Sequence, residues 1–137
     1  MPSKAVIDSG PLIALFDRDD DWHVRVVALF REFQGQLYTT VAVLTEVAHL
    51  LDFNVNVQLG FLEWVAKGAI EIIDLHVEDL ECICTLSRKY MDLPMDFADA
   101  SLVHISEKLG IQNVISIDSD FLVYRTLSNG YLRNLLV

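Results

Sequence analysis

Hydrophobic and polar positions follow two patterns along the chain: short runs that are apolar throughout, and longer runs with helical spacing. The short runs predict strands at 4–7, 36–40, 69–73 and 113–117, with a last strand or loose tail at 131–137. Helical spacing predicts helices at 11–16, 21–33, 41–52, 59–67, 77–91 and 96–109, and a short helix from 119 to about 127. Continuously apolar strands are typical of a sheet covered on both faces. Their alternation with helices therefore predicts an α/β fold with a mostly parallel sheet.

Two of the predicted strands end on an acidic residue. Asp8 follows the first apolar run and precedes the break Ser9-Gly10-Pro11, and Asp118 follows the run at 113–117. Right-handed crossovers place the carboxyl ends of all parallel strands at one edge of the sheet. Ligands of open α/β sheets bind at that edge. The pattern therefore predicts that Asp8 and Asp118 face a common site.

Two further acids lie on the apolar sides of predicted helices. Glu46 falls between Val43 and Leu50, on the side of helix 41–52 that is expected to be buried. A glutamate is almost never fully buried unless it is paired, so Glu46 needs a partner, a cation or a cleft. Asp99 lies in the first turn of helix 96–109, where it either caps the helix or joins the site; Asp96 alone would suffice as the cap.

Four carboxylates that converge on one cleft repel one another, and without cations some of them would have to be protonated. Ligation by oxygen atoms alone favours Mg²⁺ or Mn²⁺ over zinc. Two such ions can activate a water and stabilise the leaving oxygen when a phosphodiester is cleaved. The sequence contains no glycine-rich phosphate loop and no G-x-S-x-G serine motif. The predicted chemistry is therefore metal-dependent phosphodiester hydrolysis.

The length, net charge and apolar content of the chain limit its domain number, location and partners. The 137 residues predict a single domain over 1–137, and no apolar run reaches the length of a membrane span. Because the first strand begins within the first few residues, we expect no signal peptide and a cytoplasmic location. The net charge of −10 argues against a broad basic surface for nucleic acid, although bound cations reverse the local field. The apolar fraction of 53% favours either a large core or a surface that meets a partner.

Four segments together resemble the PIN-domain nucleases, and more narrowly the VapC type of toxin–antitoxin pairs. They are 6–15 (VIDSGPLIAL), 45–51 (TEVAHLL), 96–102 (DFADASL) and 115–121 (ISIDSDF). Each is weak alone, but their order and the length of the domain make the resemblance fairly specific. It implies a three-layer α/β/α sandwich, Mg²⁺-dependent (or Mn²⁺-dependent) endonuclease activity on RNA, a homodimer, and inhibition by a small antitoxin protein.

The resemblance also implies roles for individual residues. The acidic quartet of the family corresponds to Asp8, Glu46, Asp99 and Asp118, which would be both the catalytic residues and the metal ligands. Asp8 and Asp99 would be the main ligands, while Glu46 and Asp118 complete the metal shell and orient the attacking water. Flanking positions that would bind the substrate or support the acids are Ser9, Ser116, Asp96 and Asp120. Asp120 is also an alternative to Asp118 as the fourth acid.

Two other functions remain open at this point. The first is a binding module that keeps the acidic metal pocket, has little turnover and acts through a protein partner. The second is a phosphatase with an aspartyl-phosphate intermediate, but such enzymes usually carry a second acid two residues after the first, where this chain has Gly10. Neither the RNA target nor toxicity follows from the sequence.

Overall fold

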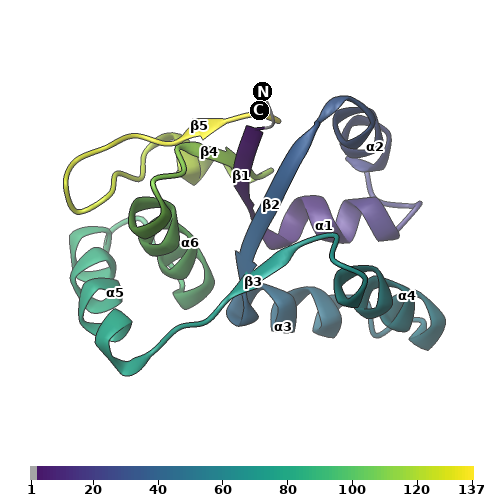
Figure 1. The fold of residues 1–137 in the computed structure, drawn as a ribbon, viewed down its shortest axis with the longest axis horizontal. Helices are drawn as coiled ribbons and strands as arrows, with labels where there is room; N and C mark the ends of the chain where they lie inside the picture. Colours follow the sequence, from purple (N-terminus) through teal and green to yellow (C-terminus); the bar gives the residue numbers. More distant parts are fainter. Residues whose placement is uncertain (1–2) are drawn as a thin grey trace.

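The computed structural model describes residues 3–137 and shows a five-stranded, fully parallel sheet (Figure 1). The strand order is β3-β2-β1-β4-β5. The strands are β1 (Ser3–Ile7), β2 (Gly35–Thr40), β3 (Glu71–Ile73), β4 (Asn113–Ile115) and β5 (Arg133–Asn134). This confirms the predicted α/β class.

Helices cover both faces of the sheet, which gives three layers (Figure 1). Helices α5 and α6 lie on one side, whereas α1, α2 and α4 lie on the other, and α3 follows directly on the carboxyl end of β2. Their bounds are α1 (Ser9–Phe16), α2 (His23–Glu32), α3 (Val41–Leu50), α4 (Val55–Ala66), α5 (Val77–Lys89) and α6 (Phe97–Leu109), and the 3₁₀ helix η1 spans Ser119–Leu122. No helix in residues 3–137 is long and apolar enough to cross a membrane.

The direction in which the chain progresses across the sheet reverses between β1 and β4. From β1 the chain adds β2 and then β3 on one side, after which it crosses back and adds β4 and β5 on the other side. Adjacent strands that lead away in opposite directions leave a crevice at their carboxyl ends, which is where α/β proteins bind ligands. The crevice between β1 and β4 is therefore the position the fold offers for a site.

Local signals explain most of the helix ends. Thr40 and Asp96 cap α3 and α6 with their side chains, and Gly110 ends α6 in a left-handed conformation with φ of 68°. The helix predicted at 59–67 in fact begins at Val55, because the Asn54 side chain accepts the N–H groups of Asn56 and Val57. From the sequence alone, Asn54 reads as part of a break at 54–56 rather than as a cap.

The predicted buried sides of two helices were partly wrong. Leu50 of α3 is 49% exposed, and the buried positions are Val43, Val47 and the following Leu51. In α5, helical spacing puts Leu80, Ile83, Cys84 and Ser87 in register, which predicts one buried face. Leu80 and Cys84 are exposed, and the buried residues are Asp79, Ile83 and Leu86.

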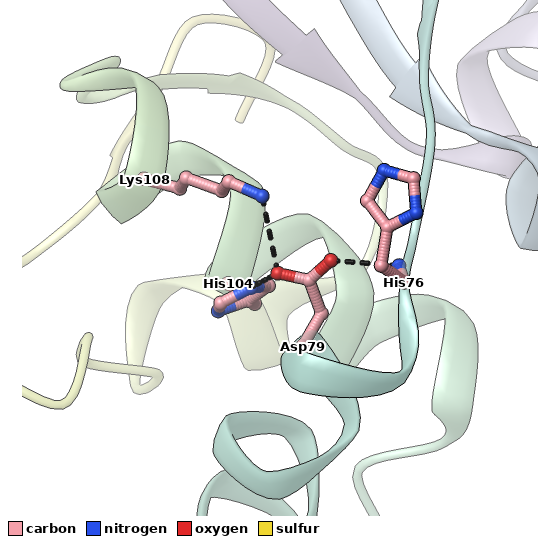
Figure 2. Close-up of polar contacts among 4 residues, drawn as sticks. All are labelled: His76, Asp79, His104 and Lys108. Carbon is pink, nitrogen blue, oxygen red and sulfur yellow. Dashed lines mark hydrogen bonds and ion pairs between the residues drawn. The ribbon is translucent and has the colours of Figure 1, made fainter.

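Asp79 is buried because it is paired on every side (Figure 2). It is 6% exposed and accepts the backbone N–H of His76 at 2.8 Å. From α6, His104 Nε2 lies 2.7 Å and Lys108 Nζ 3.2 Å from Asp79 Oδ1. The N–H of His76, followed by His104, holds the pKa of Asp79 far below its usual range. One carboxylate therefore caps α5 and joins it to α6.

Replacing Asp79 by asparagine should lower the free energy of unfolding by about 2 kcal/mol, because hydrogen bonds to a charged group are lost in a buried place. A carboxyl whose pKa is lowered on folding stabilises the native state above pH ~4, and that contribution disappears as the pH falls further. Urea denaturation at pH 7 and pH 3 measures both effects, and the two proteins should differ less at pH 3. Glu78→Gln is the control, since Glu78 is an exposed acid in the same first turn. Equal losses in both variants would contradict the assignment.

Candidate active site

Asp8 lies at the crevice because β1 ends one residue before it. Its backbone N–H continues the ladder by donating to the carbonyl of Ile115 in β4 at 3.0 Å. Its side chain caps α1 by accepting the N–H of Ser9 at 2.8 Å. The negative charge therefore lies at the amino end of a helix, where the helix dipole stabilises it.

All four predicted acids line a single cavity of about 380 Å³ at this point. Its lining residues are Asp8, Ser9, Gly10, Ile13, Asp20, Trp22, Glu46, Asp96, Asp99, Ile117 and Asp118. The structure thus brings together the residue that follows β1, residues of α1, α3 and α6, the loop before α2, and the segment after β4. Asp120 and Ser116 are not among the lining residues.

Ser116 connects two of the acids from behind the cavity. This fully buried residue donates its hydroxyl to Asp8 Oδ2 at 2.9 Å. The same Oγ accepts the backbone N–H of Asp118 at 3.0 Å. The strand predicted to run to Ile117 ends at Ile115, so Ser116 and Ile117 form the short turn that carries Asp118 to the cavity.

Asp118 and Asp120 have different surroundings. Asp118 faces the cavity and also caps η1, since its Oδ1 accepts the N–H of Asp120 at 2.9 Å. Asp120 lies inside η1 and is not among the lining residues. Burial, followed by the charge of Asp118, raises the pKa of Asp120. The geometry therefore places Asp118, rather than Asp120, with the other acids.

Asp99 is not the cap of its helix. The cap of α6 is Asp96, whose Oδ1 accepts the backbone N–H of Asp99 at 2.8 Å. The Asp99 side chain is free to face the cavity and is 8% exposed. Its Oδ2 accepts the hydroxyl of the fully buried Tyr124 at 3.3 Å. The alternative in which Asp99 merely caps the helix is thereby removed.

Glu46 reaches the cavity from the middle of α3. It is half-buried, and its Oε1 accepts the hydroxyl of Ser9. Ser9 is itself buried at the first position of α1. Glu46 was expected to need a partner, a cation or a cleft, and it has a partner in Ser9 and a cleft in the cavity. The hydrogen bond from Ser9 fixes the carboxylate of Glu46 beside Asp8.

The electrostatic cost of this arrangement appears in two pKa values. Burial, supported by the charges of Glu46 and Asp118, raises the pKa of Asp8 from 3.8 to about 6. The hydrogen bonds from Ser9 and Ser116 oppose this rise. Burial, followed by the charges of Asp8, Asp96 and Asp118, raises the pKa of Asp99 from 3.8 to about 8. The cleft concentrates more negative charge than its own hydrogen-bond donors offset.

This charge and the donor atoms suit a hard divalent cation. The lining offers carboxylate and hydroxyl oxygens, and no cysteine or histidine. Within residues 3–137, no group of three Asp, Glu, His or Cys side chains is placed to hold one ion in this arrangement. Mg²⁺ usually keeps several waters and takes one or two carboxylates, so an incomplete protein shell fits this ion. Asp8 and Asp99 are the two most buried carboxylates of the cavity.

Sequence reasoning missed three residues that shape the cavity. Trp22 and Asp20 line it from the loop before α2, and the Asp20 side chain accepts the N–H of Trp22 at 2.8 Å. The charged run at 17–21 predicts a solvated loop and a helix cap, with cation binding by its acids as the alternative. Tyr124 lies in the short helix predicted from 119 to about 127, whose spacing does not predict the hydrogen bond to Asp99. A local pattern does not reveal contacts made across the sheet.

The structure is thus an α/β domain with a cleft of carboxylates at the switch point of its parallel sheet. Comparison with known proteins identifies the family. The PIN-domain profile matches residues 5–127, which is most of the chain. The chain therefore belongs to the PIN-domain family, as its four motifs predicted.

Individual relatives are of the VapC type. Ribonuclease VapC26 of Mycobacterium tuberculosis is 25% identical over 115 residues, which are 82% of this chain and 85% of the relative. The crystal structure of M. tuberculosis VapC20, a toxin that cleaves the sarcin–ricin loop, superposes with a TM-score of 0.78 at 19% identity and covers 86% of this chain and 92% of VapC20.

Two structures of VapBC systems share the fold. One is VapBC2 of Rickettsia felis bound to a DNA fragment from its promoter, with a TM-score of 0.65, 12% identity, and coverage of 96% of this chain and 98% of that one. The other is VapBC-5 of M. tuberculosis, with a TM-score of 0.63, 19% identity, and coverage of 98% and 100%. At these identities the likeness concerns the fold.

Proposed function

We propose that this protein is a Mg²⁺-dependent (or Mn²⁺-dependent) endoribonuclease of the cytoplasm and the toxin of a toxin–antitoxin pair. The observation that carries the proposal is the convergence of Asp8, Glu46, Asp99 and Asp118 on one cavity at the switch point of the sheet. The PIN-domain family and the ribonuclease relative support it. No lysine or arginine lines the cavity, so phosphate charge has to be neutralised by bound cations.

Each acid then has a task in hydrolysis. Divalent ions bound in the cleft would supply an activated water and stabilise the leaving oxygen. Asp8 and Asp99, being the most buried, would hold these ions. Glu46 and Asp118 would complete the site and orient the water, Glu46 being fixed by Ser9 and Asp118 by the Ser116 hydroxyl. Tyr124 and Ser116 each donate to a ligand carboxylate from the side away from the cavity.

We also propose that the protein forms a homodimer and is bound by a small antitoxin protein. The two VapBC structures among its neighbours support a protein partner. Exposed apolar side chains support a protein contact as well: Val41 of α3, Val77 and Leu80 of α5, and Phe97 of α6 line a groove of about 540 Å³. Exposed apolar surface of this kind marks interaction sites.

The activity is tested by incubating the purified protein with total cellular RNA in Mg²⁺, in Mn²⁺ and with a chelator, and by mapping the new RNA ends. We expect discrete cuts that require the metal and disappear with the chelator. Cleavage that persists without metal would overturn the proposal. Protein that binds metal, cleaves no RNA and co-purifies with a small partner would instead support the binding module.

A matched pair of substitutions tests the assignment of the fourth acid. We expect Asp118→Asn to slow RNA cleavage by roughly 10–100-fold, because it removes a group that orients the metal site. Asp120→Asn should have a much smaller effect, since Asp120 does not line the cavity. Single-turnover cleavage rates at saturating Mg²⁺ compare the two proteins. The reverse order of effects would assign the role to Asp120.

A further inference from the structure

The C-terminal strand β5 has only two residues, and its backbone pairing with β4 stops short of the cavity. The N–H of Arg133 donates to the carbonyl of Gln112, and the N–H of Leu135 donates to that of Val114, both at 2.9 Å. Ser116 would be the next residue to pair with β5, but it lies outside β4, which ends at Ile115. The backbone ladder offers no partner there.

The side chain of Asn134 supplies the hydrogen-bond partners that Ser116 lacks in the backbone ladder. Its Oδ1 accepts the N–H of Ser116 at 3.3 Å, and its Nδ2 donates to the carbonyl of Ser116 at 3.0 Å. Oδ1 also accepts the N–H of Leu136 at 3.0 Å. A primary amide carries one acceptor and two donors on a plane and thus substitutes for a peptide group of a neighbouring strand. Asn134 therefore holds both main-chain polar groups of Ser116.

Fixing the backbone of Ser116 fixes its hydroxyl, which serves two acids. The hydroxyl donates to Asp8 Oδ2 at 2.9 Å and accepts the N–H of Asp118 at 3.0 Å. The side chain of Ser116 is completely buried, so no water replaces these partners. A continuous chain of hydrogen bonds therefore leads from Asn134 through Ser116 to the carboxylate of Asp8 and the backbone of Asp118.

We propose that Asn134 is a positioning residue of the acidic cleft, which sets the geometry of Asp8 and Asp118 through Ser116 without touching the cavity itself. The role in hydrolysis rests on the proposed function, whereas the positioning rests on the contacts alone. Asn134 lies outside the four motifs that mark the family, so the residues that support the site are not confined to those motifs.

Hydrogen exchange in the metal-free protein tests the positioning directly. In Asn134→Ala we expect the amide of Asp118, which Asn134 does not touch, to exchange about threefold to tenfold faster, as for loss of roughly one hydrogen bond. Asn113→Ala is the control: Asn113 is a half-buried asparagine of β4 that donates to the carbonyl of Lys4 at 3.1 Å, at the opposite end of the strand. Unchanged exchange at Asp118, or an equal change in the control, would overturn the proposal.

Metal affinity, measured by calorimetry with Mn²⁺, tests whether the effect passes through Ser116. We expect Asn134→Ala to weaken binding roughly tenfold, the lower range for residues that support metal ligands. The double variant with Ser116→Ala should bind no more weakly than Ser116→Ala alone, because contacts in one network are not additive. Fully additive losses would contradict the relay. If Asn134→Ala does not fold, Asn134→Asp, which keeps the size and the acceptor, takes its place in both measurements.

These outcomes separate the positioning role from the ribonuclease proposal. Faster exchange at Asp118 with no RNA cleavage by the unaltered protein would leave Asn134 as a positioning residue and overturn only the enzymatic function. Metal-dependent cleavage that Asn134→Ala does not slow, together with unchanged exchange, would do the reverse.

Discussion

Replacing Asp8 by asparagine is expected to abolish RNA cleavage and, in the same protein, to raise its thermal stability without metal. The activity should fall at least about 10²–10³-fold, as when a group that stabilises charge in the transition state is removed. Since burial raises the pKa of Asp8 to about 6, its charge destabilises the native state at neutral pH. A neutral side chain of the same shape should add about 1–3 kcal/mol to the free energy of unfolding.

Cleavage assays and thermal denaturation at pH 7.5 in chelator measure the two effects on one preparation. Asp52→Asn is the control, because Asp52 is an exposed acid that does not line the cavity and lies 4.0 Å from His49. It should change neither property. A loss of activity with a loss of stability would show that Asp8 supports the fold rather than the chemistry, and retained activity would remove Asp8 from the site.

The second large effect is that proton binding and metal binding at the cleft both change the free energy of unfolding. The pKa of Asp99 is about 8 in the native state and near 3.8 when it is unfolded, so the native protein binds more protons between these values. Stability without metal should therefore fall as the pH rises from about 4 to about 8, with Asp8 contributing up to about pH 6. Bound cations favour the charged carboxylates and should remove most of this dependence.

Denaturation curves at several pH values, with Mg²⁺ and with chelator, measure the dependence. Calorimetry of metal binding at pH 7 in buffers of different ionisation enthalpy counts the protons released, and we expect a net release because Asp99 starts largely protonated. Asp99→Asn should abolish most of the release. Stability that rises with pH in chelator, or metal binding without proton release, would contradict the electrostatic description of the cleft.

The parts of this structure that follow from sequence depend on local patterns. The apolar runs ending at Asp8 and Asp118 were enough to place these two residues at one edge of a parallel sheet. Asp96 and Asp99 were both compatible with a cap, and only the hydrogen bond from the Asp99 N–H to Asp96 separated the two roles. The misjudged face of α5 has the same origin, because burial of Asp79 depends on His104 and Lys108 of another helix.

Contacts between distant segments account for what the sequence did not predict. Trp22 lies in a charged loop, Tyr124 follows a single helical turn, and Asn134 lies in a strand of two residues. Helical spacing predicts a helix over 21–33 that contains Trp22 and a short helix from 119 that contains Tyr124, but spacing does not show which residues of another segment a side chain contacts. Their importance comes from side-chain contacts to Asp99 and Ser116, or from a place on the cavity wall, which appear only when the sheet has formed.

The position of β4 beside β1 has a consequence for synthesis of the protein. The bond between Ser116 and Asp8 joins residues 108 positions apart, and the supporting Asn134 comes later still. Contacts of such separation form late, after most of the chain has condensed. A nascent chain that ends before residue 113 contains Asp8, Glu46 and Asp99 but lacks β4, the strand that brings the cleft together. An unfinished copy of this length therefore has three of the four acids and no assembled site.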